Sequence, residues 1–377
     1  MEKFDWDVSK VIEAYPGSTL GYGSEFWTVE ELTPLLKRHP NFAALKDLLT
    51  KGMSYVFLRE IDEDTKREEM QSLVTRGNHK SAQDEADQVK ILLAKDVLHG
   101  FSIPFPARLL DRLRGAAGQP LGIAKQWTTG PDGKRIVKFR ITQDLSFTSN
   151  KTGPSRSIND QVNMSAYVVM VYGWCLQRIL HYTVSMRFHH PGRSIIISKY
   201  DYNNAYRCIA HSAEAAAQTV AILDKTAYLS LRLTFGGSPN PPTWCMFLEL
   251  VTDLANVLGE CMEWNPETAF SAAQQSVPAP KRLPPSSVPW AEAKPLALLV
   301  PYTEGGRVGG FINDLISVFL DSPTNLVRYT QAVPLAMHIT SRPHAGEAEE
   351  PISRRPILLQ SKLEAEGSPA EVQIVLG

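Results

Sequence analysis

An aspartate follows an apolar run in the middle of the chain. Residues 194–197 read Ser-Ile-Ile-Ile, which predicts a buried strand, and Asp201 comes four residues later. A carboxylate at the end of a strand can hold a hard divalent cation such as Mg²⁺ or Mn²⁺. Tyr206 lies five residues further on, where its ring could form a floor beneath a sugar and distinguish deoxyribose from ribose. The alternative is a strand that ends in a solvated aspartate.

A second carboxylate occurs in a pattern typical of a β-hairpin. Residues 309–320 read as strand, two-residue turn and strand, and we place Asn313 and Asp314 in the turn. Asn-Asp is good turn chemistry in its own right. If the hairpin lies beside the first strand, Asp314 projects toward Asp201. Two carboxylates on neighbouring strands are what a divalent-metal site requires.

The composition is typical of a globular protein with a large core. The chain has 377 residues, of which 43% are hydrophobic. No apolar run approaches the ~20 residues of a membrane span, and the acidic, aromatic N-terminus is not a secretory signal. The four cysteines are isolated, which predicts a reducing interior without disulfides or a zinc cluster. We therefore expect an intracellular protein, cytoplasmic or nuclear and not secreted, with no membrane partner. Its oligomeric state stays open.

The net charge of −1 hides an uneven distribution. Residues 101–200 carry 14 Lys and Arg against 4 Asp and Glu, whereas the segments on either side are acidic. A basic block in a near-neutral chain is expected where phosphates are bound. The same block is also compatible with a solvated basic face.

Residues 1–100 are expected to form an N-terminal helical extension. Thr28 and Glu31 have the spacing of a capping box before an amphipathic stretch. Residues 84–98 repeat apolar side chains at helical spacing.

Residues 119–148 read as a basic β-hairpin. Gly130-Pro-Asp-Gly133 is a strong turn signal between two strand-like arms. The hairpin could fold over a bound triphosphate, or its charges could simply keep an exposed face in water. Its arms carry the cations Lys125, Lys134, Arg135, Lys138 and Arg140.

A rigid loop at residues 235–242 leads into a helix. Pro241 and Pro242 suit the first helical turn, and the apolar stripe that follows is interpreted as core. Residues 265–295 contain seven prolines and no periodicity, which favours a linker or an insertion.

Taken in order, these segments resemble reverse transcriptases of retroelements over roughly residues 119–377. The segments that carry the resemblance are Lys138–Ser146 with Ser157–Asp160, Asp201–Tyr206, Phe235–Trp244, Phe311–Asp314, and Lys362 with Val375–Gly377.

The resemblance implies an α+β right-hand polymerase with fingers and palm, an antiparallel palm sheet backed by helices, and no thumb. It places the fingers in residues 101–200 and the first part of the palm in residues 201–262. A Pro-rich insertion or linker then spans residues 263–297. The second part of the palm, with the Asn313–Asp314 hairpin, occupies residues 298–377.

The resemblance also implies RNA-directed DNA polymerase chemistry: dNTPs are added to a primer 3′-end on an RNA or DNA template by two-metal phosphoryl transfer, with Mg²⁺ or Mn²⁺ as cofactor. The implied catalytic residues are Asp201, Asp314 and Asn313. The implied metal ligands are Asp201, Asp314 and the backbone carbonyl of Tyr202. Asp144 would steady the basic hairpin. The implied substrate-binding residues are Arg140, Lys125, Tyr206, Ala205, Phe235, Gly236 and Lys362.

Two departures from the family pattern lower the expected activity. Asn313 stands where the family has the first Asp of a pair, and a neutral amide offsets none of the charge of a metal pair. Asp321 could replace it only through a register shift. The chain also stops at Gly377, where the primer grip would begin. We therefore expect an impaired fragment of a retroelement polyprotein that binds template–primer weakly.

Two other functions are considered. A non-catalytic pseudo-polymerase relic would keep nucleic-acid binding without the chemistry. A hydrolase using His189, His190 or His211 has little support, because the sequence contains no Gly-x-Ser-x-Gly, His-Glu-x-x-His or phosphate-binding loop motif.

Overall fold

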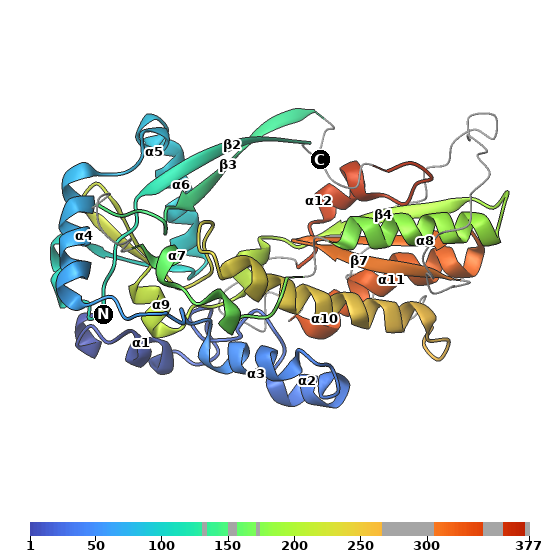
Figure 1. The fold of residues 1–377 in the computed structure, drawn as a ribbon, viewed down its shortest axis with the longest axis horizontal. Coiled ribbons are helices and arrows are strands. Elements are labelled where there is room, and N and C mark those ends of the chain that lie inside the picture. The colour runs from blue at the N-terminus through green and yellow to red at the C-terminus, as the bar shows by residue number, and fades with distance from the viewer. Residues whose placement is uncertain (130–133, 150–156, 171–173, 266–304, 342–356, 374–377) are drawn as a thin grey trace. The chain divides into compact units, whose positions relative to one another are not determined.

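The computed structural model describes residues 1–129, 134–149, 157–170, 174–265, 305–341 and 357–373. The chain folds into two compact units (Figure 1). Unit 1 contains Met1–Trp127, Val137–Val169 and Asn204–Trp244, and unit 2 contains Thr128–Ile136, Met170–Asn203 and Cys245–Gly377.

Short helices make up much of unit 1. The capping box predicted at Thr28 is confirmed, since the Glu31 carboxylate accepts from the Thr28 N–H at 2.9 Å and the Thr28 hydroxyl accepts from the Glu31 N–H. The helices are α1 (Val8–Ala14), α2 (Val29–Leu36), α3 (Phe42–Lys51), α4 (Glu63–Arg76), α5 (Lys80–Asp84), α6 (Ala86–Leu98), α7 (Ile158–Gln161) and α9 (Ala213–Ala217).

The sheet of unit 1 has three antiparallel strands in the order β1–β6–β5. They are β1 (Ser102–Pro106), β5 (Val220–Leu223) and β6 (Thr226–Ser230).

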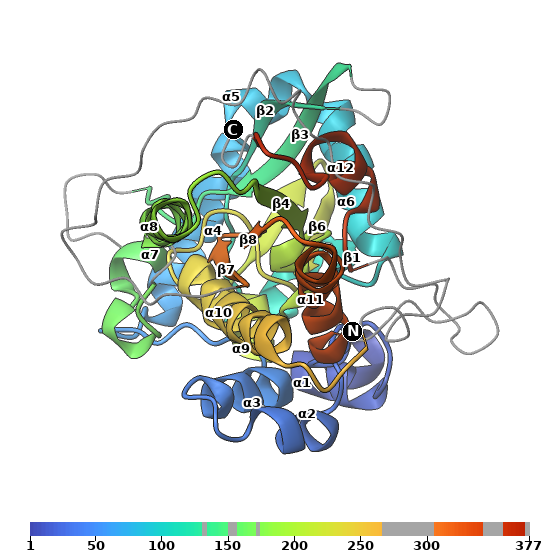
Figure 2. The same ribbon diagram turned by 90° about the vertical axis from the view of Figure 1, so that its right-hand side faces the viewer.

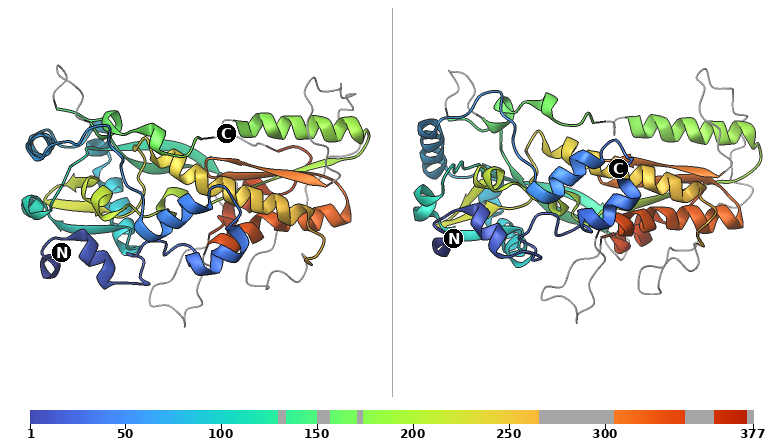
Figure 3. Two further views of the ribbon diagram at one scale, coloured as in Figure 1. Left: turned by 60° about the horizontal axis from the view of Figure 1, so that its bottom comes forward. Right: turned by 90° about the horizontal axis from the view of Figure 1, so that it is seen from below.

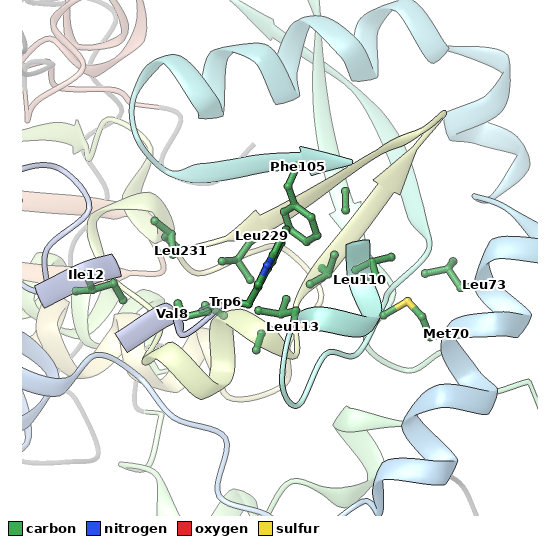
Figure 4. Packing of buried hydrophobic residues seen from close by; sticks show 14 residues of the cluster. Trp6, Val8, Ile12, Met70, Leu73, Phe105, Leu110, Leu113, Leu229 and Leu231 are labelled. Atoms are coloured by element: carbon green, nitrogen blue, oxygen red, sulfur yellow. The ribbon is translucent and has the colours of Figure 1, made fainter. Parts of the chain in front are cut away.

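The N-terminal residues share one core with this sheet (Figure 4). Trp6 from the first turns packs edge-on against Phe105 of β1, with ring centroids 5.5 Å apart, and both rings lie in a cluster with Leu229 of β6. Residues 1–100 are therefore not set apart as the extension that we expected. Nor do residues 201–262 form one part, because their contacts assign Asn204–Trp244 to unit 1 and the residues on either side to unit 2.

The basic hairpin consists of β2 (Leu121–Thr129) and β3 (Arg135–Gln143), which are hydrogen-bonded to each other. Its turn, residues 130–133, lies outside the described residues.

Helix α10 (Asn240–Glu260) begins, as predicted, with Pro241 and Pro242 in its first turn. Trp244, Phe247 and Val251 are buried, so the apolar stripe of this helix is core. The proline-rich segment expected at 263–297 lies outside the described residues from 266 onward.

Unit 2 is built on an antiparallel sheet with the strand order β4–β8–β7. Its strands are β4 (Ile195–Asp201), β7 (Gly306–Phe311) and β8 (Asp314–Leu320), and its other helices are α8 (Cys175–His189), α11 (Pro323–Thr340) and α12 (Gln360–Lys362), which continues into a π-turn at Leu363–Gly367.

Helices cover both faces of this sheet (Figures 2 and 3). Because side chains alternate along a strand, Ile195 and Ile197 of β4 point to the face that α8 covers through Ile179. Ile196 points to the opposite face, where it packs with Tyr329 of α11. An antiparallel sheet covered in this way, together with the helices of unit 1, gives an α+β protein.

Both outer edges of the sheet find hydrogen-bond partners. On β7, the Asn256 side chain of α10 accepts from the Val308 N–H at 2.9 Å and donates to the Val308 carbonyl at 3.0 Å. On β4, Ile197 and Ala370 exchange two backbone hydrogen bonds of 2.8 and 2.9 Å. No helix among the described ranges is long and apolar enough to cross a membrane.

Candidate active site

Asp201 and Asp314 are direct partners across β4 and β8. The Tyr202 N–H donates to the Asn313 carbonyl at 3.1 Å, so the neighbouring Asp201–Asp314 pair is a non-hydrogen-bonded one. In such pairs the Cα atoms are about 4.5 Å apart and both side chains stand on the same face. The two carboxylates therefore lie side by side on one face, at the end of the sheet, as the sequence predicts.

The two-residue turn of the β7–β8 hairpin is Ile312–Asn313, not Asn313–Asp314 as we expected. Phe311 pairs directly with Asp314, which makes Asp314 the first residue of β8. Ile312 takes the left-handed conformation (φ 54°), which a tight two-residue turn requires and a β-branched residue rarely adopts. This one-residue shift places the Asp314 side chain on the sheet face.

Asn313 lies in the β7–β8 turn, directly before Asp314 in sequence and in contact with Asp201. Its side-chain amide donates to Asp201 Oδ1. The predicted catalytic position 313 therefore holds a neutral hydrogen-bond donor in contact with Asp201.

Lys362 joins both carboxylates. Its Nζ lies 3.0 Å from Asp201 Oδ2 and 3.5 Å from Asp314 Oδ1. The carboxylate side chains are 8% and 16% exposed, so this ion pair is shielded from water. We expected Lys362 to bind substrate, and the structure places it on the two acids.

A second lysine faces the same cluster. Lys199 lies two residues before Asp201 on β4, hence on the same face, and its buried Nζ is 3.7 Å from Glu366 Oε2. Burial raises the pKa of Asp314, although the positive charge of Lys362 opposes the rise. Burial alone would lower the pKa of Lys362, but the charges of Asp201 and Asp314 outweigh it and that pKa is raised.

The donor set fits one divalent cation better than two. Two carboxylates that already face a common ammonium can face a common metal ion, and both offer the hard oxygen ligands that Mg²⁺ prefers. Asp321 does not supply a third, because it follows the opposite end of β8, where its N–H donates to the Ser194 carbonyl. Within the described residues there is no group of three His, Cys, Asp or Glu side chains placed to hold a metal.

Three of the expected substrate-binding residues form a stack within unit 1. The Tyr206 and Phe235 rings lie 5.0 Å apart between centroids, and the Arg140 guanidinium lies over the Phe235 ring at 5.6 Å. A guanidinium over an aromatic face is held by a cation–π interaction. This stack presents a cation beside two rings. Ala205 precedes Tyr206 in the same short 3₁₀-helix and is buried.

Gly236 is required for its backbone geometry. It has φ 135°, and a Cβ at this position would lie 1.7 Å from the Gln143 carbonyl oxygen. The Asn159 side chain holds the same loop, donating to the Gly236 carbonyl and accepting from the Ser238 N–H, both at 2.8 Å.

The hairpin residues Lys125 and Asp144 already have protein partners. Lys125 pairs with Glu85 and lies over the Phe139 ring. Asp144 Oδ2 lies 2.9 Å from His79 Nε2. The steadying role expected of Asp144 is thus compatible with its contacts, whereas Lys125 could reach a phosphate only by leaving Glu85.

The histidines give no sign of hydrolase chemistry. His211 is fully buried, and burial lowers its pKa to about 4, so it is neutral at pH 7. Its Nδ1 lies 3.0 Å from the Ser230 carbonyl, to which it donates in the neutral form. His189 and His190 lie at the C-terminal end of α8.

Sequence reasoning missed Lys199, Glu366 and Asn159. The first two follow simple spacings that could have indicated them: Lys199 precedes Asp201 by one strand period, and Glu366 follows Lys362 by one helical turn. Asn159 lies in the segment Ser157–Asp160, which carries part of the family resemblance. Its side chain holds a loop 77 residues away, and this contact has no local sequence signal.

No family model matches the chain, and no curated protein matches it. Solved structures of foamy virus protease–reverse transcriptase show a weak likeness. The native prototype foamy virus enzyme is 14% identical with a TM-score of 0.37, over 70% of this chain and 23% of that one. Foamy viral complexes with double-stranded DNA and with an RNA/DNA hybrid are 11% and 9% identical, with TM-scores of 0.36 and 0.34. This chain covers 33% and 25% of those two chains. A likeness at this level does not by itself establish a shared activity.

Proposed function

We propose that the chain is a reverse transcriptase-type polymerase domain, an RNA-directed DNA polymerase with palm and fingers, that adds dNTPs to a primer 3′-end on an RNA or DNA template and is impaired by Asn313. The observation that carries the proposal is the pairing of Asp201 with Asp314 at one end of an antiparallel sheet.

Asp201 and Asp314 would hold Mg²⁺ or Mn²⁺, with the Tyr202 carbonyl as a further ligand. When bound, the metal supplies positive charge that stabilises the developing phosphoryl transition state. The acids themselves position this charge: both stand on one face and point at one cation-binding position, which Lys362 occupies.

Asn313 accounts for the expected impairment. Polymerase chemistry with two divalent metal ions needs enough carboxylates to balance their four positive charges. The amide of Asn313 contributes no negative charge. Removing one electrostatic contact of a catalytic site typically costs about 10²–10³-fold in kcat. We therefore expect slow extension with either Mg²⁺ or Mn²⁺.

The stack of Arg140, Phe235 and Tyr206 is the proposed nucleotide-binding surface. Arg140 would bind the triphosphate, since a guanidinium matches phosphate geometry. Tyr206, whose ring is tilted by 35° against the Phe235 ring, would lie beneath the sugar and disfavour a 2′-hydroxyl.

Primer extension tests the proposal. The wild-type chain, Asp201→Ala and the matched control Asp321→Ala are incubated with an RNA template, a DNA primer, dNTPs and Mg²⁺ or Mn²⁺. Extension by wild type and Asp321→Ala but not by Asp201→Ala supports it, because only Asp201 belongs to the site. Extension that persists in Asp201→Ala refutes the assignment.

A second candidate is a non-catalytic nucleic-acid-binding pseudo-polymerase. Two contacts favour it: Lys362 neutralises the acids, and the Asn313 amide donates to Asp201. Its signature is salt-sensitive binding of template–primer, equal in wild type and Asp201→Ala, without extension by either.

A further inference from the structure

Lys362 occupies the position where a metal ion would bind both acids. Its ammonium contacts one oxygen of each carboxylate, at 3.0 Å on Asp201 and 3.5 Å on Asp314. A metal ion that bridges the same two carboxylate oxygens would take the position of the ammonium. Ammonium and metal therefore cannot share the site without rearrangement.

The segment that carries Lys362 forms backbone hydrogen bonds with β4 both before and after this residue in sequence. Before it, the Leu359 N–H donates to the Asp201 carbonyl at 3.0 Å. After it, Ala370 exchanges two backbone hydrogen bonds with Ile197. Gly367 allows this segment to approach the β4 backbone closely, because a Cβ at Gly367 would lie 2.1 Å from the Lys199 carbonyl oxygen. The contact with the acids is thus held by backbone pairing as well as by charge.

The charges of the cluster are nearly balanced. Asp201, Asp314 and Glu366 face Lys362 and Lys199, so three carboxylates and two ammonium groups leave a net charge of −1. Buried acids need a compensating partner, and here the chain supplies it. A divalent cation therefore gains less from this cluster than from acids without an ammonium partner.

We propose that Lys362 is a resident counter-ion that competes with divalent metal ions for Asp201 and Asp314, so that metal binds only when the ammonium leaves. This inference rests on the metal-binding role of the two acids within the proposed function, but not on polymerase activity. Removal of the ammonium leaves the acids with a net charge suited to a divalent cation. Lys362 is in this respect an autoinhibitory residue.

Mn²⁺ binding tests the competition directly. The dissociation constant for Mn²⁺ is measured by titration calorimetry and by the paramagnetic resonance signal of free Mn²⁺, for wild type, Lys362→Met and Lys362→Arg. Methionine keeps the apolar stem without the charge, whereas arginine keeps the charge. We expect Lys362→Met to bind Mn²⁺ at least ~10-fold more tightly than wild type, because the loss of an ion-pair partner leaves shielded acids uncompensated. Lys362→Arg should resemble wild type.

The site of the gained affinity is checked with Asp201→Asn in the Lys362→Met background, which should lose it. Lys51→Met is the matched control, because Lys51 is exposed and pairs with Asp47 in unit 1. Equal Mn²⁺ affinity in wild type and Lys362→Met, or no measurable binding by either, overturns the inference.

A second measurement needs no substitution and covers the case in which Lys362→Met fails to fold. Wild-type protein is treated briefly with an amine-reactive acetylating reagent, with and without Mn²⁺, and the modified lysines are quantified by peptide mass spectrometry. Displacement predicts faster modification of Lys362 in Mn²⁺, with Lys51 unchanged. An unchanged Lys362 rate at saturating Mn²⁺ contradicts displacement. Neither measurement depends on primer extension. A failure of the proposed polymerase activity can therefore be told apart from a failure of the competition between Lys362 and metal.

Discussion

The side-chain amide of Asn313 donates a hydrogen bond to Asp201 across the end of the β4–β8 pair. Asn313 lies in the hairpin turn and Asp201 closes the adjacent strand, so the contact joins two segments 112 residues apart. A carboxylate at position 313 would repel Asp201 when no metal ion is bound. Asparagine replaces this repulsion with a hydrogen bond, at the expense of a third charged ligand.

The edge contact of Asn256 with Val308 should be important for the stability of unit 2. Asn256→Leu leaves the Val308 N–H and carbonyl without this partner, and an unsatisfied buried polar group costs about 1–3 kcal/mol. We expect the free energy of unfolding in urea to fall by about 2–4 kcal/mol. The control Val257→Ala, at an exposed position on the same helix, should change it by no more than about 0.5 kcal/mol. Equal effects of the two substitutions would contradict the edge role.

Gly236 should not tolerate alanine. The added Cβ would overlap the Gln143 carbonyl at a backbone angle that side chains rarely adopt, and we expect a loss of about 3 kcal/mol or more in unfolding free energy. Gly115→Ala is the matched control, since Gly115 has φ 71° and open space around it, and should cost about 1–2 kcal/mol. Equal stability of the two variants in urea would contradict the close approach of Gly236 to the Gln143 carbonyl.

His211 should make stability depend on pH. Its pKa is about 4 in the folded chain against about 6.5 when unfolded, so between these values the unfolded chain binds the extra proton. The stabilisation is therefore fully present above about pH 6.5 and is lost as the pH falls toward 4, by up to about 3 kcal/mol.

Urea unfolding at several pH values between 4 and 7 measures this dependence. His211→Gln should flatten the decline in unfolding free energy, whereas His189→Gln, at an exposed position, should leave it as in wild type. A decline that is the same in His211→Gln and wild type would show that another group is responsible.

Parts of the site follow from local sequence pattern. The apolar run before Asp201 predicts β4, and the strand–turn–strand pattern of residues 309–320 predicts a hairpin, because strand pattern is a local property. The turn was misplaced by one residue because Ile312 adopts a positive φ, which its β-branched side chain does not favour.

Other parts depend on contacts between distant segments. The position of Lys362 follows from the pairing of its segment with β4, and the shared core of Trp6 with β1 joins residues 99 positions apart in sequence. No local pattern near Lys362 or Trp6 encodes these partners. Sequence could therefore nominate Lys362 but could not show that it contacts the acids.

The substitution Asn313→Asp should restore the charge that the site lacks. Primer extension on an RNA template is measured for wild type, Asn313→Asp and the double variant Asn313→Asp with Asp201→Ala, over a range of Mg²⁺ concentrations. If the two acids form a polymerase site that lacks one charged ligand, Asn313→Asp extends the primer about 10²-fold faster or more, and the double variant does not extend it. Extension that is no faster in Asn313→Asp than in wild type, with template–primer binding intact, would show that Asp201 and Asp314 do not form such a polymerase site.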